Sequence, residues 1–130
     1  MSPPWMTEAR RIAARESSPM EKLASICELL AAEVPYYDWV GFYLVSETTP
    51  GTLALGPFVG EPTEHTHIAF GAGICGQAAA TAQTFVIQDV KQESNYLSCS
   101  PAVQAELVVP IFRGQVLVGE IDIDSHTPAA

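Results

Sequence analysis

The stretch Phe70-Gly-Ala-Gly-Ile-Cys-Gly76, read together with Leu97-Ser-Cys-Ser-Pro101, is the starting point for interpreting this chain. Each stretch places one cysteine among glycine or serine residues, between segments that are apolar. Such residues favour loops, and a thiol in a loop can be reached by a small molecule. We therefore expect Cys75 and Cys99 to be the reactive cysteines of the protein.

The segment before these loops predicts one strong helix. Ser18-Pro19 is typical of a helix N-terminus, and apolar residues then recur at helical spacing until Pro35. Cys27 lies on this apolar stripe, so we interpret it as a buried core residue. Residues 1–18 are polar and contain prolines, and we expect them to form an N-terminal extension or helix before a single domain over residues 19–130.

The remaining segments predict strands joined by polar or glycine-containing turns. Residues 39–45 and 53–59 flank a polar turn and predict a hairpin, and a second hairpin closes the chain around Arg113-Gly114. This order of elements is typical of an α+β domain with a central antiparallel sheet and flanking helices. The strands are expected at residues 39–45, 53–59, 67–70, 84–88, 106–112 and 116–124, and a short helix at 77–82.

Length, charge and cysteine content limit the class of protein. A chain of 130 residues suits one domain, and its net charge of -9 with a pI near 4.5 opposes binding to nucleic acid or to anionic membranes. The start of the chain lacks the basic and apolar runs of a signal peptide, and no apolar stretch is long enough to cross a membrane. Three cysteines without a dense disulfide pattern are typical of a reducing compartment, so we expect a cytoplasmic protein.

Acidic residues gather on one strand near the end of the chain. Asp122 and Asp124 project from the same face of this strand, and Glu120 shares that face. If the face is buried, the carboxylates repel one another, and one of them holds a proton near neutral pH as a general acid does. If the face is exposed, it is an ordinary solvated surface. The spacing alone leaves both interpretations open.

Glu106 joins this acidic group only in one strand register. A two-residue turn that pairs Phe112 with Gln115 places Glu106 opposite Ile121, on the other face of the sheet. A bulge marked by Pro110 would shift the pairing by one residue and bring Glu106 to the acidic face.

The remaining candidates are aromatic rings and thiols. Trp39 and Tyr43 share a strand face and form either the wall of a ligand pocket or part of an ordinary core. Cys75 lies near a possible helix N-terminus, where the macrodipole lowers the pKa of a thiol. Cys99 lies in a polar loop, where a thiolate is accessible, and is the better candidate for the reactive cysteine.

Two further patterns indicate ligands only weakly. His65 and His67 lack the partner cysteines or histidines of a zinc site. Residues 71–76 fit the dinucleotide pattern G-x-G-x-x-G, with Asp89 at a suitable distance, but the helix that follows is short and the chain has no second βαβ half. We therefore expect neither a metal nor an organic cofactor.

Taken together, the spaced motifs of the chain resemble the free methionine-(R)-sulfoxide reductases, which are GAF-domain enzymes. The resemblance extends from Met20 to Ser125, and the whole set is more specific than any single motif. The motifs are Asp38-Trp-Val-Gly-Phe-Tyr43, Leu55-Gly-Pro-Phe58, Gly73-Ile-Cys-Gly76, Cys99, Glu106-Leu-Val-Val-Pro110 and Gly119-Glu-Ile-Asp-Ile-Asp-Ser125.

The resemblance implies reduction of free methionine-(R)-sulfoxide by a thiol mechanism. Cys99 matches the nucleophile of the family, which would take the sulfoxide oxygen and become a sulfenic acid. Cys75 would then close a disulfide, which thioredoxin reduces.

The resemblance also assigns the substrate site. In the family, three acids hold the polar groups of the substrate and assist protonation of the departing oxygen, and two aromatic residues line the pocket. The matching residues here are Glu106, Asp122, Asp124, Trp39 and Tyr43. From the same resemblance we expect a homodimer.

The chain departs from the family pattern in two places. His65 stands where many members carry a further cysteine, and Ser100 stands where an aspartate commonly follows the nucleophile. Cys75 is then the only matched cysteine left to resolve Cys99. The alternative function is therefore a GAF sensor or binding module, which keeps the pocket for another small ligand and no longer turns it over.

Overall fold

The computed structural model describes residues 5–14, 18–88 and 103–126. Within these ranges, no helix is both long and apolar enough to cross a membrane. The helices are α1 (Trp5–Ala14), α2 (Pro19–Glu33) and α3 (Gly73–Thr81), and the strands are β1 (Trp39–Val45), β2 (Thr52–Val59), β3 (His67–Ala69), β4 (Phe85–Ile87), β5 (Ala105–Arg113) and β6 (Val116–Ser125).

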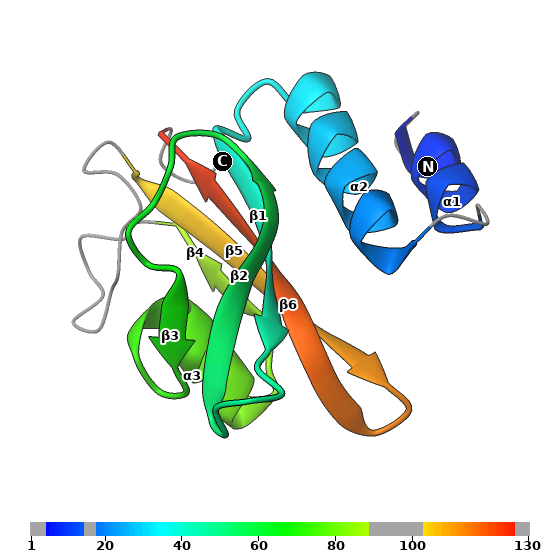
Figure 1. Ribbon diagram of the computed structural model, residues 1–130. Coiled ribbons are helices and arrows are strands. Elements are labelled where there is room, and N and C mark those ends of the chain that lie inside the picture. Colours follow the sequence, from blue (N-terminus) through cyan, green and yellow to red (C-terminus); the bar gives the residue numbers. More distant parts are fainter. Residues whose placement is uncertain (1–4, 15–17, 89–102, 127–130) are drawn as a thin grey trace.

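The six strands form one antiparallel sheet in the order β3-β2-β1-β6-β5-β4 (Figure 1). β1 and β2 are the predicted first hairpin, and β5 and β6 are the predicted last one. Every predicted strand limit lies within one residue of the observed limit. The predicted α+β class with a central antiparallel sheet is therefore confirmed, and β1 and β6 lie side by side at its centre.

Alternation along β1 divides the core into two layers, one on each face of the sheet. Val40 and Phe42 pack with Cys27 of α2 on one face. Trp39 and Tyr43 pack on the opposite face, beneath α3. The sheet thus separates α1 and α2 from α3 (Figure 1).

The helix that contains Cys27 begins where the sequence predicts. The hydroxyl of Ser18 accepts a hydrogen bond from the backbone N–H of Glu21 at 3.2 Å, which caps the helix N-terminus. α1 precedes it and packs on α2 through a buried Ile12. The predicted core role of Cys27 is confirmed, because its side chain is fully buried and its Sγ donates to the carbonyl oxygen of Pro57 at 3.6 Å.

α3 begins at Gly73, earlier than the predicted helix over residues 77–82. The glycine-rich stretch around Cys75 is therefore the first turn of a helix, and the expectation of an accessible loop there is wrong. Positive φ angles of 93° at Gly71 and 63° at Gly73 turn the chain from β3 into this helix.

The turn between β5 and β6 lies one residue later than predicted. Gly114 and Gln115 form the turn, with φ of 63° at Gly114, and Arg113 pairs with Val116. Only glycine adopts this φ without strain, so the glycine belongs at the first turn position and not at the second.

A bulge in the same hairpin decides which residues face the site. The pairing shifts between Ile111 and Phe112, where β6 contributes one extra residue, Val118. As a result Glu106 lies directly opposite Asp124. Glu106 therefore reaches the acidic face, but the predicted cause is wrong: Pro110 pairs regularly with Glu120, the bulge lies at Val118, and Glu106 is paired three residues further along β6 than the simple turn predicted.

Candidate functional site

Four carboxyl groups lie buried on the face of the sheet that α3 covers. Asp122, Asp124 and Glu120 project from alternate positions of β6, and Glu106 projects from β5 beside them. Their exposed fractions are 5% for Glu106, 0% for Glu120, 5% for Asp122 and 2% for Asp124. The alternative of a solvated acidic surface is therefore wrong.

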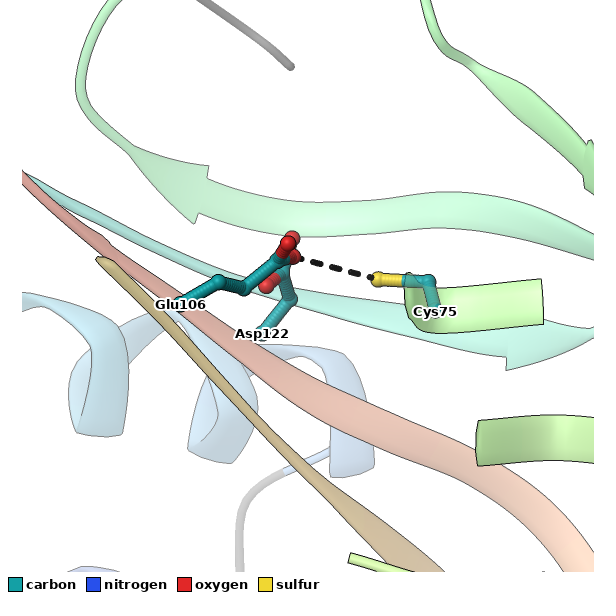
Figure 2. Close-up of side chains that lie close together, drawn as sticks. All are labelled: Cys75, Glu106 and Asp122. Carbon is teal, nitrogen blue, oxygen red and sulfur yellow. Dashed lines mark hydrogen bonds between the residues drawn. The ribbon is translucent and has the colours of Figure 1, made fainter. Parts of the chain in front are cut away.

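The first turn of α3 brings Cys75 to this acidic group. Its thiol donates a hydrogen bond to Oε2 of Glu106, with 3.8 Å between the sulfur and the oxygen. One carboxylate oxygen each from Glu106 and Asp122 and the Sγ of Cys75 all lie within 4.8 Å of one another (Figure 2). Cys75 is 4% exposed, so the thiol is held inside the protein and not in an open loop.

Burial and mutual repulsion keep protons on these groups. Desolvation raises the pKa of Glu106 well above its usual range, and the charges of Asp122 and Asp124 raise it further. Desolvation also raises the pKa of Asp122, and it raises that of Glu120 to about 8. The site therefore holds carboxylic acids near neutral pH, as proton donation requires.

The same environment raises the pKa of the Cys75 thiol well above its ordinary value, first through desolvation and then through the carboxylates, of which Asp122 contributes most. We expected the N-terminal end of a helix to lower this pKa. That expectation is wrong, because burial and four nearby acids outweigh the helix macrodipole.

A cavity of about 280 Å³, part of it open to solvent, lies above the acids. Cys75, Asp122 and Asp124 line it on the protein interior side, and Tyr43 and His65 contribute to its wall. The remaining lining residues are Thr63, Ile68, Ala72, Gly73 and Ile74. Two of the four acids and the buried thiol therefore line this partly open space.

The two predicted aromatic residues are brought together beside this cavity. Trp39 stacks on Tyr43 with ring centroids 6.3 Å apart and on Phe58 at 5.4 Å. A hydrogen bond holds each ring in place. The indole N–H of Trp39 donates to the backbone carbonyl oxygen of Glu61 at 3.0 Å. The hydroxyl of Tyr43 donates to the backbone carbonyl oxygen of His65 at 2.8 Å. Of the two predicted wall residues, Tyr43 lines the cavity, whereas Trp39 is not among the lining residues and stacks on Tyr43.

Cys75, Glu106 and Asp122 are donors that a small cation can use, and their spacing would admit one. Binding there would require a thiol and two carboxylic acids to lose their protons, which burial opposes at each group. We therefore interpret these three side chains as protonated groups that can donate protons, and we assign none of them as a metal ligand.

Several predicted residues lie outside the described ranges. Cys99 and Ser100 are among them, and so is Asp89, which was considered for nucleotide binding.

Sequence reasoning missed the contribution of the segment before β3 to the cavity. Thr63 and His65 lie in this segment, which has neither helical nor strand periodicity. Only the family resemblance, which matches His65 to a cysteine position of many members, could have indicated a place near the site.

Several known proteins are similar to this chain. The chain matches the GAF domain family over residues 20–130. It is 36% identical to the free methionine-R-sulfoxide reductase of Escherichia coli over 112 residues, which are 86% of this chain and 66% of that protein.

Two solved structures are also similar. The free methionine-R-sulfoxide reductase from Neisseria meningitidis, solved in complex with its substrate, superposes with a TM-score of 0.89 at 35% identity, over 95% of this chain and 72% of that one. The type II free methionine-R-sulfoxide reductase from Thermoplasma acidophilum gives a TM-score of 0.80 at 40% identity, over 85% of this chain and 77% of that one. In fold and sequence alike, this chain belongs to the GAF-domain family of free methionine-R-sulfoxide reductases.

Proposed function

We propose that the protein reduces free methionine-(R)-sulfoxide to methionine by a two-cysteine mechanism. The observation that carries the proposal is the set of buried carboxylic acids packed against the Cys75 thiol beside a cavity. The reaction needs a proton source beside a departing oxygen and a thiol to accept the oxidation, and it requires no metal or organic cofactor.

The cavity suits a small zwitterion with a sulfoxide group. Asp122 and Asp124 line it and would bind the ammonium group of the substrate. Glu106 does not line the cavity but accepts the hydrogen bond of the Cys75 thiol at 3.8 Å, and as a protonated acid it would supply the proton that the departing oxygen needs. The apolar side chain of the substrate would lie against Tyr43, which Trp39 holds in place.

The chemistry proceeds in two balanced steps. The Cys99 thiol reduces the sulfoxide, so that the oxygen leaves the substrate as methionine forms and Cys99 becomes a sulfenic acid. The thiol of Cys75 then attacks the Cys99 sulfur, and the sulfenic oxygen leaves as water while a disulfide forms. A thioredoxin dithiol returns the disulfide to two thiols and is itself oxidised.

The surroundings of Cys27 and Cys75 support the assignment of Cys75 as the resolving cysteine. Cys27 lies on the opposite face of the sheet, and burial raises its pKa to about 12, which keeps it a neutral thiol. Cys75 instead lines the cavity and faces the acids. Of the two cysteines that the structure describes, Cys75 alone lines the cavity, which supports its assignment as the resolving thiol.

The cellular and assembly aspects of the proposal rest on the family resemblance. We infer that the protein acts in the cytoplasm, where thioredoxin keeps thiols reduced, and that residues 19–130 form the catalytic domain. We also infer a homodimer; Met20, at the start of α2, is 48% exposed and offers apolar surface for such a contact. Light scattering on the purified chain would give the mass and test the dimer directly.

The function is tested by following methionine production from free methionine-(R)-sulfoxide with a thioredoxin system. Cys99→Ser should abolish turnover, because it removes the sulfur that accepts the oxygen. Cys27→Ala is the matched control and should retain turnover, because that thiol lies on the other face of the sheet.

Full activity in Cys99→Ser would refute the assigned nucleophile. If the folded wild-type protein, fully reduced, binds the sulfoxide without releasing methionine, the proposal fails and the alternative of a GAF binding module replaces it.

A further inference from the structure

The segment that joins β2 to β3, residues 60–66, forms part of the cavity wall and belongs to no helix or strand (Figure 1). Thr63 and His65 of this segment line the cavity, so the position of the segment sets the shape of the space above the acids. A connecting segment outside the ladder of a sheet depends on side-chain contacts to keep one position.

Two side chains of β1 hold this segment, one near each end. The indole N–H of Trp39 donates to the backbone carbonyl oxygen of Glu61 at 3.0 Å, and the hydroxyl of Tyr43 donates to that of His65 at 2.8 Å. The two donors and the two acceptors have the same spacing along the chain, so residues 61–65 follow β1 from one hydrogen bond to the other. Thr63 lies between these two anchors, and His65 lies at the second one.

The packing around Trp39 shows that the position of the indole is closely set. Trp39 is 3% exposed and stacks on Phe58 with ring centroids 5.4 Å apart. Gly60 has a φ of 132°, and a Cβ atom there would lie 2.6 Å from Cδ1 of the indole. A Cβ atom at Gly41 would also overlap the indole ring. Glycine at both positions thus lets the backbone approach the ring, whose N–H is directed at Glu61.

We propose that Trp39 and the hydroxyl of Tyr43 are positioning residues for substrate binding, because their two hydrogen bonds hold residues 61–65 in place as the cavity wall. In the described part of the chain, Trp39 is absent from the cavity lining, so it acts on the substrate through this wall and not by contact. The inference rests on the proposed function, which supplies the substrate.

The loss of one anchor should weaken binding more than chemistry. The Cys75 thiol and the acids lie on α3, β5 and β6, which are separate elements from β1 and from the wall segment. They therefore keep their places when the wall loosens. A single hydrogen bond changes an equilibrium constant by roughly 2- to 10-fold, which is the size of effect expected on the KM.

The test removes each donor while an aromatic ring stays in place. Trp39→Phe removes the indole N–H, and Tyr43→Phe removes the hydroxyl. The matched controls are Trp5→Phe on α1 and Tyr36→Phe at an exposed position. In each anchor variant the KM for free methionine-(R)-sulfoxide should rise roughly 2- to 10-fold with kcat nearly unchanged, and titration calorimetry of the reduced protein should show the same loss of affinity. The controls should keep the wild-type values.

Amide hydrogen exchange reports on the wall in the absence of any ligand. The backbone N–H of His65 donates to Oγ1 of Thr63 at 3.1 Å, and that of Thr66 donates to the carbonyl oxygen of Glu64 at 3.0 Å. Both amides are protected while the segment keeps this shape. In the anchor variants they should exchange faster, whereas the amides of β5 and β6 should exchange as in the wild type.

A second perturbation leaves both donors in place. Gly60→Ala adds a Cβ atom that would overlap the ring of Trp39, so it should displace the segment and raise the KM as the anchor variants do. Gly51→Ala is the control, because Gly51 also has a positive φ, 69°, but an added Cβ atom there meets no other atom within 4 Å. Gly51→Ala should therefore keep the wild-type KM.

Each outcome has a defined meaning. An unchanged KM in both anchor variants overturns the inference and leaves the proposed function standing, and so does a loss confined to kcat. Faster exchange throughout β5 and β6 also overturns it, because the variants would then destabilise the whole domain. If Trp39→Phe does not fold, Tyr43→Phe and Gly60→Ala decide by the same criteria. A wild type that neither binds nor reduces the sulfoxide refutes the proposed function, and the exchange data then support or overturn the anchoring by themselves.

Discussion

At the scale of single residues, the site consists of buried carboxyl groups whose desolvation lowers the stability of the fold. Glu106, Asp122 and Glu120 are buried with oxygens that lack hydrogen-bond partners among the described residues. Each therefore has a pKa raised by desolvation. Such clusters of perturbed acids are typical of functional sites, where a proton must be held at neutral pH.

Glu120→Gln should change how stability depends on pH. The pKa of Glu120 is about 8 in the folded protein and near 4.5 when unperturbed, so the folded state binds this proton more tightly. Its contribution to stability is full below pH ~4.5 and is lost as pH rises through ~8. The free energy of unfolding of Glu120→Gln relative to wild type should rise across this window by roughly 3 to 5 kcal/mol.

Urea unfolding at pH values across the window would measure the difference. Ala80→Ser, at an exposed position that carries no ionisable group, serves as the control and should leave the slope with pH as in the wild type. A difference between Glu120→Gln and wild type that stays constant with pH would contradict the raised pKa.

At the scale of elements, the glycine-rich stretch sets the position of α3. Gly71 and Gly73 provide the positive φ angles of the turn. At Gly76, a Cβ atom would overlap the carbonyl oxygen of Ala69, so the first turn of α3 can pack closely against the end of β3 only with glycine there. The glycines that resemble a dinucleotide pattern thus bring Cys75 down onto the acids.

Gly76→Ala should destabilise the protein by about 1–3 kcal/mol, the usual cost of forcing an atom into a packed site. The matched control is Ala80→Ser on the exposed side of the same helix, which should change stability by less than about 0.5 kcal/mol. The denaturant midpoints of the two variants and the wild type would measure these changes in stability. Equal stability of Gly76→Ala and wild type would show that α3 does not depend on this close approach.

At the scale of the whole molecule, the sheet separates the N-terminal helices α1 and α2 from the acidic site, which lies on its other face. α1 packs on the outer side of α2, away from the sheet (Figure 1). Its buried Ile12 is 4% exposed, and Trp5 packs against the core layer of Phe42 and Cys27. α1 is therefore expected to detach locally without unfolding the sheet.

Ile12→Ala should weaken this docking by about 2–5 kcal/mol, because it removes a buried side chain. Amide hydrogen exchange should accelerate over residues 5–14 and change little in β1 and β6. Thr7→Ala, on an exposed position of α1, is the control. Accelerated exchange throughout the sheet would show instead that α1 unfolds together with the domain.

Much of this protein is determined by its sequence alone. Alternation in residues 39–45 and 116–124 predicted both the strands and the face of each side chain, because the period of a strand is a local property. The same alternation placed Asp122 and Asp124 together. The helix that contains Cys27 was equally predictable, since its cap and its apolar stripe lie within a few turns of each other.

Only the tertiary structure decided whether these acids form a site. Glu106 reaches Asp124 through a later turn and a bulge at Val118, and each of these shifts moves the pairing by a residue or more. The burial of the acids, and the high pKa of the Cys75 thiol, depend on α3 packing over β5 and β6. Register and burial arise from contacts between distant segments, which the local periodicity of a sequence does not encode.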